Sequence, residues 1–454
     1  MERDELARWL DDNDVEIVRI DATGVEGTLL GKHVARRKFE SCLPSGVALN
    51  DIGLAMDLGG TPQLGWWGDW RQDALGDALL RPDLSTLTAV AHEPGIAWCT
   101  ADITGVDGVP LPVCPRSLLA RQQADLDALG YSVRAAFELE FFVFEDRIDA
   151  ARRKGFRNLT PLGGAAPKQS YMTQRSPEFV PLLRELSLSL ERAGVPWEAF
   201  SDEAGPGQFE LNIAPGDAVT AADRAARAKQ ILREVAYAHG KSVTFMARPF
   251  PEMPYGNGLH VHVSLWRGDE PAFADPRVLR HWVAGCMATV AGMTSIATPT
   301  VNSFRRQVDF VAAPTTPTWG EENKAAAVRT VTRTGALARM EHRVAAGDAN
   351  PYLVLAGVLA GGISGLVEEL EPPEPVAGLP WGLPEDHPRL PHSLTTAAAA
   401  LAADTRLRAR LGDAFIEHWT ESRKFEWLMF HTGGGDPDAT GSTDWELARY
   451  FEWV

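Results

Sequence analysis

The chain has 454 residues, 45% of them hydrophobic and 23% charged, which is ordinary for a globular protein with enough apolar material for a large core. Lys and Arg number 44 against 61 Asp and Glu, a formal net charge of −17. This acidic balance argues against a nucleic-acid partner, because binding along a phosphate backbone needs a cationic surface. The length predicts two domains, or one large domain with a smaller one.

The N-terminal part of the chain is predicted to be a small β-rich domain. Residues 1–13 have a helical pattern, and residues 16–34 are typical of two short strands around a turn at Gly24. Residues 45–113 are rich in Gly, Pro, Trp and Asp, with short β-like runs such as STLTAV and GIAWCT.

Helices and strands alternate from residue 114 onwards. A Pro near the start and Gly130 after the end predict a helix at 114–130, and Ser176, Pro177 and Gly194 bound a second one. Strands are predicted at 133–144, 195–201, 208–214, 242–248, 258–266 and 336–344, further helices at 217–240, 276–297, 350–367 and from 389 onwards, an irregular stretch at 300–322, and a helix or turn at 323–330.

The cysteines and apolar stretches indicate a protein of the reducing cytoplasm with no membrane partner. No two of the four cysteines form a CxxC pair, so we expect buried thiols at Cys42, Cys99, Cys114 and Cys286. The N-terminus is acidic and amphipathic, unlike a signal peptide. The uncharged stretch at 350–367 is short for a membrane span and rich in Gly, which predicts a buried core helix.

Four of the predicted strands carry an unusual polar face. Side chains at i and i+2 of a strand point the same way. In AAFELEFFVFED, Glu138 and Glu140 therefore share one face, opposite a run of apolar residues. The equivalent faces of QFELNI, GLHVHVSLW and LARMEHRV carry Glu210 and Asn212; His260, His262 and Ser264; and Arg339, Glu341 and Arg343.

A solvated face is the simplest interpretation of any one of these strands taken alone. Together, however, the four faces are rich in Glu and His, and Glu203 adds a fifth carboxylate. Carboxylates packed together repel one another unless cations neutralise them. The pattern therefore predicts a site for Mg²⁺ or Mn²⁺ in preference to zinc, because carboxylates dominate and no cysteine joins them.

Arginines near these strands suggest that the cations serve phosphoryl transfer. Arg339 and Arg343 flank Glu341, and other cations near these motifs are Arg305, Arg306, Lys324 and Arg329. Arginine suits the binding of carboxylate or phosphate, and metal with arginine is typical of phosphoryl-transfer sites. The chain has neither GxxxxGK[ST] nor GxGxxG, so neither a P-loop nor a Rossmann nucleotide site is implied.

In this order the motifs resemble those of the glutamine synthetase family, over most of residues 100–355. The matching segments read FELEF, EAGPGQFE, ARPFPEMPYGNGLHVHVS, NSFRR and RMEHRVAAGDANPY. The resemblance implies an α+β fold with a β-grasp domain at 1–108 and a catalytic domain at 109–454, whose curved antiparallel sheet is backed by helices. It also implies a homo-oligomer of two stacked hexameric rings, a dodecamer with sites between subunits.

The resemblance also implies a role for each matching residue. One metal would be held by Glu140, Glu203 and Glu210, and a second by Glu138, His260 and Glu341, with two to three Mg²⁺ or Mn²⁺ per site. Glutamate would be bound by Arg306, Arg343, Gly256 and Asn257, and ATP by His262, Ser264, Lys324, Arg329 and Arg339. Arg339, Glu203 and Arg306 are the residues expected to act in catalysis. Lys324 stands where the family usually has Arg. Lysine keeps the positive charge but lacks the planar guanidinium group that can bind two oxygens at once.

The implied reaction has two steps. ATP phosphorylates the γ-carboxylate of glutamate, and a nitrogen nucleophile then displaces phosphate from the acyl phosphate. Two departures from the family pattern bear on that nucleophile. Ammonia-using members carry Glu just before an Ala-Pro pair, whereas the matching segment DFVAAP has Ala312 at that position. The N-terminal Asp-Gly-Ser-Ser loop of those members is not recognisable in this sequence. Ammonium needs anionic or acceptor groups around it, so the sequence favours a larger amine.

Other interpretations remain open at the level of sequence. Asp51 or Asp57 could replace the missing loop aspartate, which would leave a true glutamine synthetase that uses ammonium. Trp66, Trp67 and Trp70 could line an enlarged amine pocket, although clustered Trp residues usually pack in a core. A non-catalytic structural ring is the third interpretation, and the retention of all six candidate metal ligands argues against it.

Overall fold

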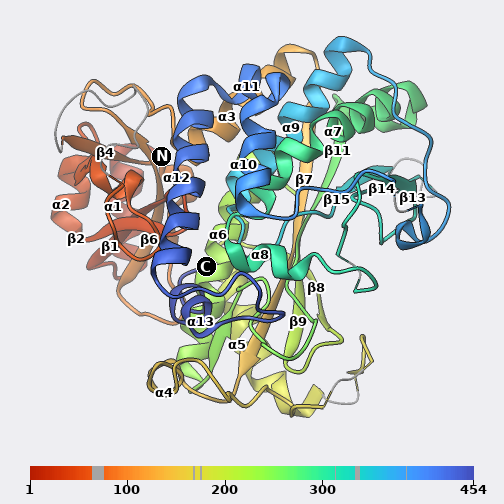
Figure 1. Ribbon diagram of the computed structural model, residues 1–454. Coiled ribbons are helices and arrows are strands. Elements are labelled where there is room, and N and C mark those ends of the chain that lie inside the picture. Colours follow the sequence, from red (N-terminus) through yellow and green to blue (C-terminus); the bar gives the residue numbers. More distant parts are fainter. Residues whose placement is uncertain (64–75, 167–168, 174–175, 312, 333–337, 385) are drawn as a thin grey trace.

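The computed structural model describes residues 1–454 except 64–75, 167–168, 174–175, 312, 333–337 and 385 (Figure 1). Its first sheet lies in the N-terminal part, in the order β2-β1-β6-β4-β3 with β5 on β6. The elements are α1 (Arg3–Asp12), β1 (Ile17–Thr23), β2 (Leu29–Ala35), α2 (Arg36–Cys42), β3 (Val47–Asn50), β4 (Asp77–Pro82), β5 (Thr88–Ala89) and β6 (Ile96–Thr104). The predicted N-terminal helix and the two strands around Gly24 are confirmed, and β1 pairs with β6 in parallel.

A second, larger sheet follows in the order β13-β14-β15-β11-β7-β9-β8, with β10 on β7 and β12 on β11. Its strands are β7 (Ser132–Phe144), β8 (Trp197–Asp202), β9 (Gln208–Ile213), β10 (Ser242–Thr244), β11 (Leu259–Arg267), β12 (Glu270–Pro271), β13 (Trp319–Glu321), β14 (Val328–Val331) and β15 (Arg339–His342). Every pairing in it is antiparallel except that of β13 with β14. The chain is therefore an α+β protein, as predicted.

Helices pack around this sheet and between the two sheets (Figure 1). They are α3 (Pro115–Ala128), α4 (Ile148–Arg153), α5 (Ser176–Arg192), α6 (Ala218–Ala238), α7 (Pro276–Ala297), α8 (Val301–Arg306), α9 (Pro351–Glu368), α10 (Leu394–Ala403), α11 (Thr405–Leu411), α12 (Asp413–Thr432) and α13 (Asp444–Tyr450). Helix α3 contacts β1 and β6 on one side and α6 and α9 on the other. One continuous apolar core runs through both parts, so the boundary at 108/109 stays a prediction.

The apolar stretch at 350–367 forms α9, a core helix. It is the one helix among the described residues that is long and apolar enough to cross a membrane, but 83% of it is buried inside the protein. Its glycines allow α7 to approach closely: a Cβ on Gly285 would lie 2.0 Å from the carbonyl oxygen of Gly361. The prediction of a buried helix is confirmed, and the four cysteines are free and buried, also as predicted.

Two predictions of local structure are wrong in part. The stretch 300–322 is not wholly irregular, because it contains α8 and β13. The predicted helix or turn at 323–330 is a turn at residues 324–325 and becomes strand β14 from residue 328 onwards. Local composition, with three alanines at 325–327, favours a helix there. Pairing with β15, which places Arg329 opposite Glu341, overrides that preference.

Helix α12 carries a buried histidine that makes stability depend on pH. His418 is 3% exposed, and burial together with Arg423 lowers its pKa from 6.5 to about 4. The unfolded chain binds the proton more tightly, so stability is lost as pH falls from 6.5 towards 4. We expect this residue to reduce the free energy of unfolding by about 2 kcal/mol between pH 7 and pH 5. Denaturant unfolding should show a smaller loss for His418→Gln, and an equal loss would contradict the assignment.

Candidate active site

The registers of four neighbouring strands bring the predicted polar faces together. On β7, Glu138 lies opposite His260 of β11, and Glu140 lies opposite Glu210 of β9. On the other edge of β11, His262 lies opposite Glu341 of β15. The carboxylates and histidines thus come from adjacent strands, in the arrangement that the alternation of each strand suggested.

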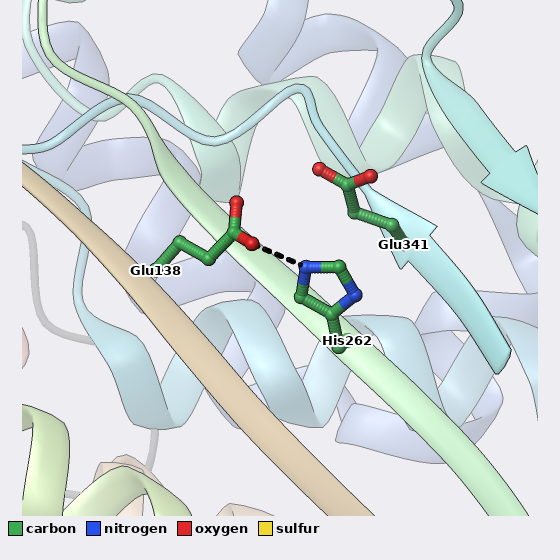
Figure 2. A group of neighbouring side chains, drawn as sticks. All are labelled: Glu138, His262 and Glu341. Atoms are coloured by element: carbon green, nitrogen blue, oxygen red, sulfur yellow. Dashed lines mark hydrogen bonds and ion pairs between the residues drawn. The ribbon is translucent and has the colours of Figure 1, made fainter. Parts of the chain in front are cut away.

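Glu138 is the centre of this cluster. Its Oε1 lies 2.9 Å from Nε2 of His262, and its Oε2 lies 3.2 Å from Nδ1 of His260. Figure 2 shows the side chains of Glu138, His262 and Glu341 pointing toward one another from three different strands. Burial alone would raise the pKa of Glu138, but the hydrogen bonds and charges of the two histidines hold it well below its usual range.

Two overlapping groups of side chains have the spacing of a metal site. Glu138, His262 and Glu341 form one, and Glu138, Glu210 and His260 form the other, with candidate ligand atoms within 4.8 Å of one another in each. His262, which was assigned to ATP, therefore lies as close to Glu138 as His260 does. Oxygen and imidazole donors without a thiol suit Mg²⁺ or Mn²⁺, so the residues fit the predicted ions.

Glu140 and Glu203 join Glu210 in this cluster. Oε2 of Glu140 accepts a hydrogen bond from the Gly258 backbone N–H at 2.6 Å, and its Oε1 lies 3.8 Å from Nδ1 of His260. Burial, with repulsion by Glu140, raises the pKa of Glu203 to about 7. Burial and three neighbouring carboxylates raise the pKa of Glu210 to about 8. Burial is the larger cause of both shifts and repulsion between the carboxylates is the second, and a bound cation would relieve that repulsion.

Glu341 is the fully buried member of the cluster. Arg329 donates to its Oε2 at 3.0 Å, and Arg343 donates to its Oε1. Burial alone would raise the pKa of Glu341, but Arg343 and the two histidines lower it to about 2. Arg329 also pairs with Glu322 at 2.8 Å, so its charge is shared between two carboxylates.

Arg306 brings a positive charge without a direct ion pair among the described residues to the same place. Its side chain is buried, its Nη2 lies 3.4 Å from Nε2 of His260, and its Nη1 donates to the Val344 carbonyl at 3.4 Å. Among the described residues, no carboxylate oxygen lies within 4 Å of it. Burial lowers the pKa of Arg306 below its ordinary value, although the nearby charge of Glu140 acts in the opposite direction. This guanidinium is placed to receive an anionic substrate group.

The predicted substrate loop, with Gly256 and Asn257, lies beside Arg306. A Cβ on Gly256 would lie 2.4 Å from the Ala247 carbonyl oxygen, so only glycine fits there. The side chain of Gln208, which sequence reasoning missed, donates to the Gly256 carbonyl at 2.9 Å and accepts from the Gly205 N–H at 3.1 Å. Gln208 thereby ties the turn after Glu203 to the substrate loop.

A cavity of about 500 Å³ opens next to the cluster. Three of the five residues predicted for ATP line it, namely His262, Ser264 and Arg339, as does Glu138. Sequence reasoning missed Trp266 and Arg134, which also line it: Trp266 donates to Oγ of Ser264 at 3.1 Å, and the Arg134 guanidinium lies 3.7 Å from the centre of a Trp266 ring. The alternation of β11 could have revealed Trp266, because it follows Ser264 by two residues.

The two other residues predicted for ATP lie elsewhere around the cluster. Arg329 is held by Glu341 and Glu322, as described above, and Lys324 lies in the turn before β14, close enough for its charge to favour the ionised form of Glu203. Neither lines the 500 Å³ cavity. Lys324 lines a shallow groove with Asn323 and Trp381 instead.

Several residues predicted to shape the amine site lie outside the described part of the chain. They are Ala312, Trp66, Trp67 and Trp70. Asp57, one candidate for the missing loop aspartate, is buried and accepts hydrogen bonds from the backbone of Gly59 and Thr61. Its carboxylate also pairs with Arg449 at 2.7 Å, so its partners within its own chain hold it in place.

Comparison with known proteins agrees with this geometry. Residues 112–450 match the family model described as glutamine synthetase, catalytic domain. The chain is 30% identical to a glutamate–isopropylamine ligase of a Pseudomonas species, over 98% of this chain and 97% of the relative. It is 32% identical to a γ-glutamylethanolamide synthetase of Streptomyces coelicolor, over 99% of this chain and 95% of the relative.

A solved structure also resembles the whole chain. The structure of apo GmaS without ligand superposes with a TM-score of 0.82 at 26% identity, covering 97% of this chain and 98% of that one. The match of the catalytic-domain model over three quarters of the sequence, together with relatives of near-equal length, establishes the relationship. The chain belongs to the glutamine synthetase family of ligases.

Proposed function

We propose that this protein is an ATP-dependent glutamate–amine ligase. It joins the γ-carboxylate of glutamate to an amine through a γ-glutamyl phosphate intermediate. The observation that carries the proposal is the cluster in which five carboxylates and two histidines lie beside the buried guanidinium of Arg306. A non-catalytic ring has no physical reason to keep carboxylates that raise one another's pKa.

Two divalent cations are proposed to bind in the cluster. Glu140, Glu203 and Glu210 would hold one, and Glu138, His260 and Glu341 the other, with His262 close enough to Glu138 to join either the metal or a phosphate. When bound, the cations neutralise the charge that develops on the transferring phosphoryl group. Arg329 and Arg343 fix the direction of the Glu341 carboxylate by hydrogen bonding, and the charge of Arg343 favours its ionised form.

ATP is proposed to occupy the 500 Å³ cavity. Trp266 and Arg134 offer a flat apolar and cationic surface for the base, and Ser264 offers a hydroxyl. Arg339 donates to Nδ1 of His262 at 3.2 Å, at the end of the cavity that meets Glu138. The triphosphate would therefore point toward the metals, with Arg339 at the transferring phosphoryl group and Lys324 near Glu203.

Glutamate is proposed to lie against Arg306, Arg343 and the loop of Gly256 and Asn257. Arg306 binds a substrate carboxylate, and the glycine lets the backbone approach it. The γ-carboxylate oxygen attacks the terminal phosphorus and ADP leaves. The amine nitrogen then attacks the acyl carbon, the carbon–oxygen bond to phosphate breaks, and the nitrogen gives up a proton as the amide forms. Glu203, which belongs to the same cluster, is proposed to act in this step.

The acceptor is proposed to be an amine larger than ammonium. The two curated relatives carry isopropylamine and ethanolamide in their names, and Ala312 replaces the glutamate of ammonia-using members. Asp57, which could have supplied the missing acid, is paired with Arg449. The family further suggests a cytoplasmic dodecamer of two stacked hexameric rings, with sites between subunits.

Phosphate release with ATP, Mg²⁺ and glutamate tests the proposal. The acceptors to compare are ammonium, polyamines, ethanolamine, short alkylamines and anilines. We expect release that depends on both glutamate and one class of amine, and mass spectrometry should identify the γ-glutamyl amide. Turnover with ammonium above that with every amine would instead identify a glutamine synthetase, and no glutamate-dependent turnover with any acceptor would refute the ligase proposal.

Cation binding should depend on pH. The raised pKa values, about 7 for Glu203 and about 8 for Glu210, mean that at pH 7 without a cation Glu210 is mostly protonated and Glu203 is about half protonated. A cation must displace these protons, so affinity should rise between pH 6 and pH 8. Calorimetric titration with Mn²⁺ at pH 7, in buffers of different protonation enthalpy, should show roughly one proton released per site. Glu210→Gln should release fewer, and proton-neutral binding by the native protein would contradict the assignment.

A further inference from the structure

A second cavity lies beside α8, apart from the candidate active site. Its volume is about 400 Å³, and its wall comes from α8, the start of α10, the last turns of α12 and residues 437–440. None of the predicted metal, glutamate or ATP residues lines it. Phe304 and Arg305 of α8 contribute to the wall, whereas Arg306 of the same helix reaches His260. A cavity of this size accommodates a small organic molecule.

Most of the wall is apolar and aromatic. Phe304, Trp427 and Phe430 supply rings, and Val301 and Leu394 supply aliphatic surface. These five side chains belong to a small apolar cluster that is separate from the main core, and Phe304 and Trp427 are only partly buried in it. The rings of Trp427 and Phe430 are stacked with their centres 5.8 Å apart. The partly buried rings leave apolar surface that a flat organic group would cover.

A buried guanidinium, that of Arg248, lies in this wall without an acidic partner. The residue is 8% exposed, its Nε donates to the Met253 carbonyl at 3.0 Å, and its Nη1 donates to the Arg305 carbonyl at 3.0 Å. Its Nη2 makes no hydrogen bond to a described residue and, unlike the buried unpaired atoms elsewhere in the chain, keeps contact with solvent. Burial lowers the pKa of Arg248 below its ordinary value, and the like charge of Arg305 acts in the same direction.

Acidic side chains do not offset this charge inside the cavity. No acid among the described residues lines the wall. The charge of Glu446 favours the ionised form of Arg248, but both oxygens of Glu446 accept from Nε of Arg305, at 2.9 and 2.8 Å. Glu446 therefore compensates Arg305 from behind the wall. Asp436 and Asp438, on the loop that supplies residues 437–440, are exposed and do not line the cavity.

We propose that this cavity binds a small aromatic carboxylate. The free Nη2 of Arg248 donates to the carboxylate, and the rings of Phe304 and Trp427 pack against the aromatic group. His392 lines the same wall, makes no hydrogen bond to a described residue and offers a further donor. A carboxylate suits one unpaired cation, whereas a phosphate dianion would leave a charge uncompensated. This site is separate from the proposed ligase site and does not depend on the proposed function.

Calorimetric titration of the full-length protein, without ATP, glutamate or metal, tests the proposal. Phenylacetate is the probe, acetate controls for the charge alone and phenylacetamide controls for the ring alone. We expect saturable binding of phenylacetate and binding weaker by roughly tenfold or more for each control, because each lacks one of the two recognised groups. Phenylacetamide that binds as tightly as phenylacetate would contradict a role for Arg248. No saturable binding of phenylacetate overturns the proposal.

Variants separate this cavity from the active site. Thr440 is an exposed wall residue, so its variants should fold normally. Thr440→Glu places a negative charge in the wall and should weaken phenylacetate binding by roughly tenfold or more, whereas Thr440→Gln adds similar volume without the charge and should largely retain it. Equal losses in the two variants would contradict an anionic ligand.

Arg306→Gln should leave phenylacetate binding unchanged, because Arg306 does not line this cavity. If Arg306→Gln abolishes binding while Thr440→Glu keeps it, the probe occupies the proposed glutamate site and the inference is refuted. That result would leave the ligase proposal intact, and a failed ligase assay would leave this titration unaffected.

Discussion

Glu140→Ala is expected to abolish glutamate-dependent ATP turnover, with a loss of roughly 10³-fold or more. The side chain lies between the candidate metal ligands of β9 and the substrate loop, where it accepts the Gly258 N–H at 2.6 Å and approaches His260 at 3.8 Å. Its removal takes one negative charge from the metal cluster and frees a backbone donor. Steady-state phosphate release over a range of Mg²⁺ concentrations measures the loss.

Two further variants test whether the loss of activity comes from the missing negative charge of Glu140. Glu140→Gln keeps an acceptor for Gly258 but loses the charge, so it should be nearly as inactive as the alanine variant if metal binding is the role. Glu145→Gln changes an exposed glutamate just beyond the same strand, paired with Lys241, and should retain activity. Full turnover by Glu140→Ala would remove this carboxylate from the proposed site.

Arg306→Gln is expected to raise KM for glutamate by roughly 100-fold or more, with a smaller effect on KM for ATP. The guanidinium is buried, pairs with no carboxylate among the described residues and faces His260, so a substrate carboxylate is the partner that its charge lacks. Arg306→Lys restores the charge without the planar fork and should recover part of the affinity. Initial rates at varied glutamate and fixed saturating ATP measure the change.

The control for that series is Arg277→Gln at the exposed start of α7, which removes one arginine of a surface ion pair with Asp275. An exposed ion pair contributes little to stability, so this variant should fold normally. Its KM values should then match those of the native protein, because Arg277 is not part of the candidate site. An Arg306→Gln variant with an unchanged KM for glutamate would place the substrate carboxylate elsewhere in the site.

The sequence alone determined which residue types form the candidate site and which of them point to the same face of a strand. Glu138 and Glu140 had to share a face because β7 alternates, and the same rule placed His260 with His262 and Arg339 with Glu341. The core position of α9 followed from its uncharged, glycine-rich composition. These properties depend on residue type and on the geometry of one element, so no neighbour is needed to predict them.

Strand order and register were decided by the tertiary structure. Nothing local in the sequence placed His262 opposite Glu341 and within 2.9 Å of Glu138, or made residues 328–331 a strand rather than a helix. The candidate metal ligands likewise come from strands that lie far apart in the chain, from Glu138 on β7 to Glu341 on β15. Such arrangements arise from long-range burial and pairing, whose energies outweigh local preferences and leave no periodic signal in the chain.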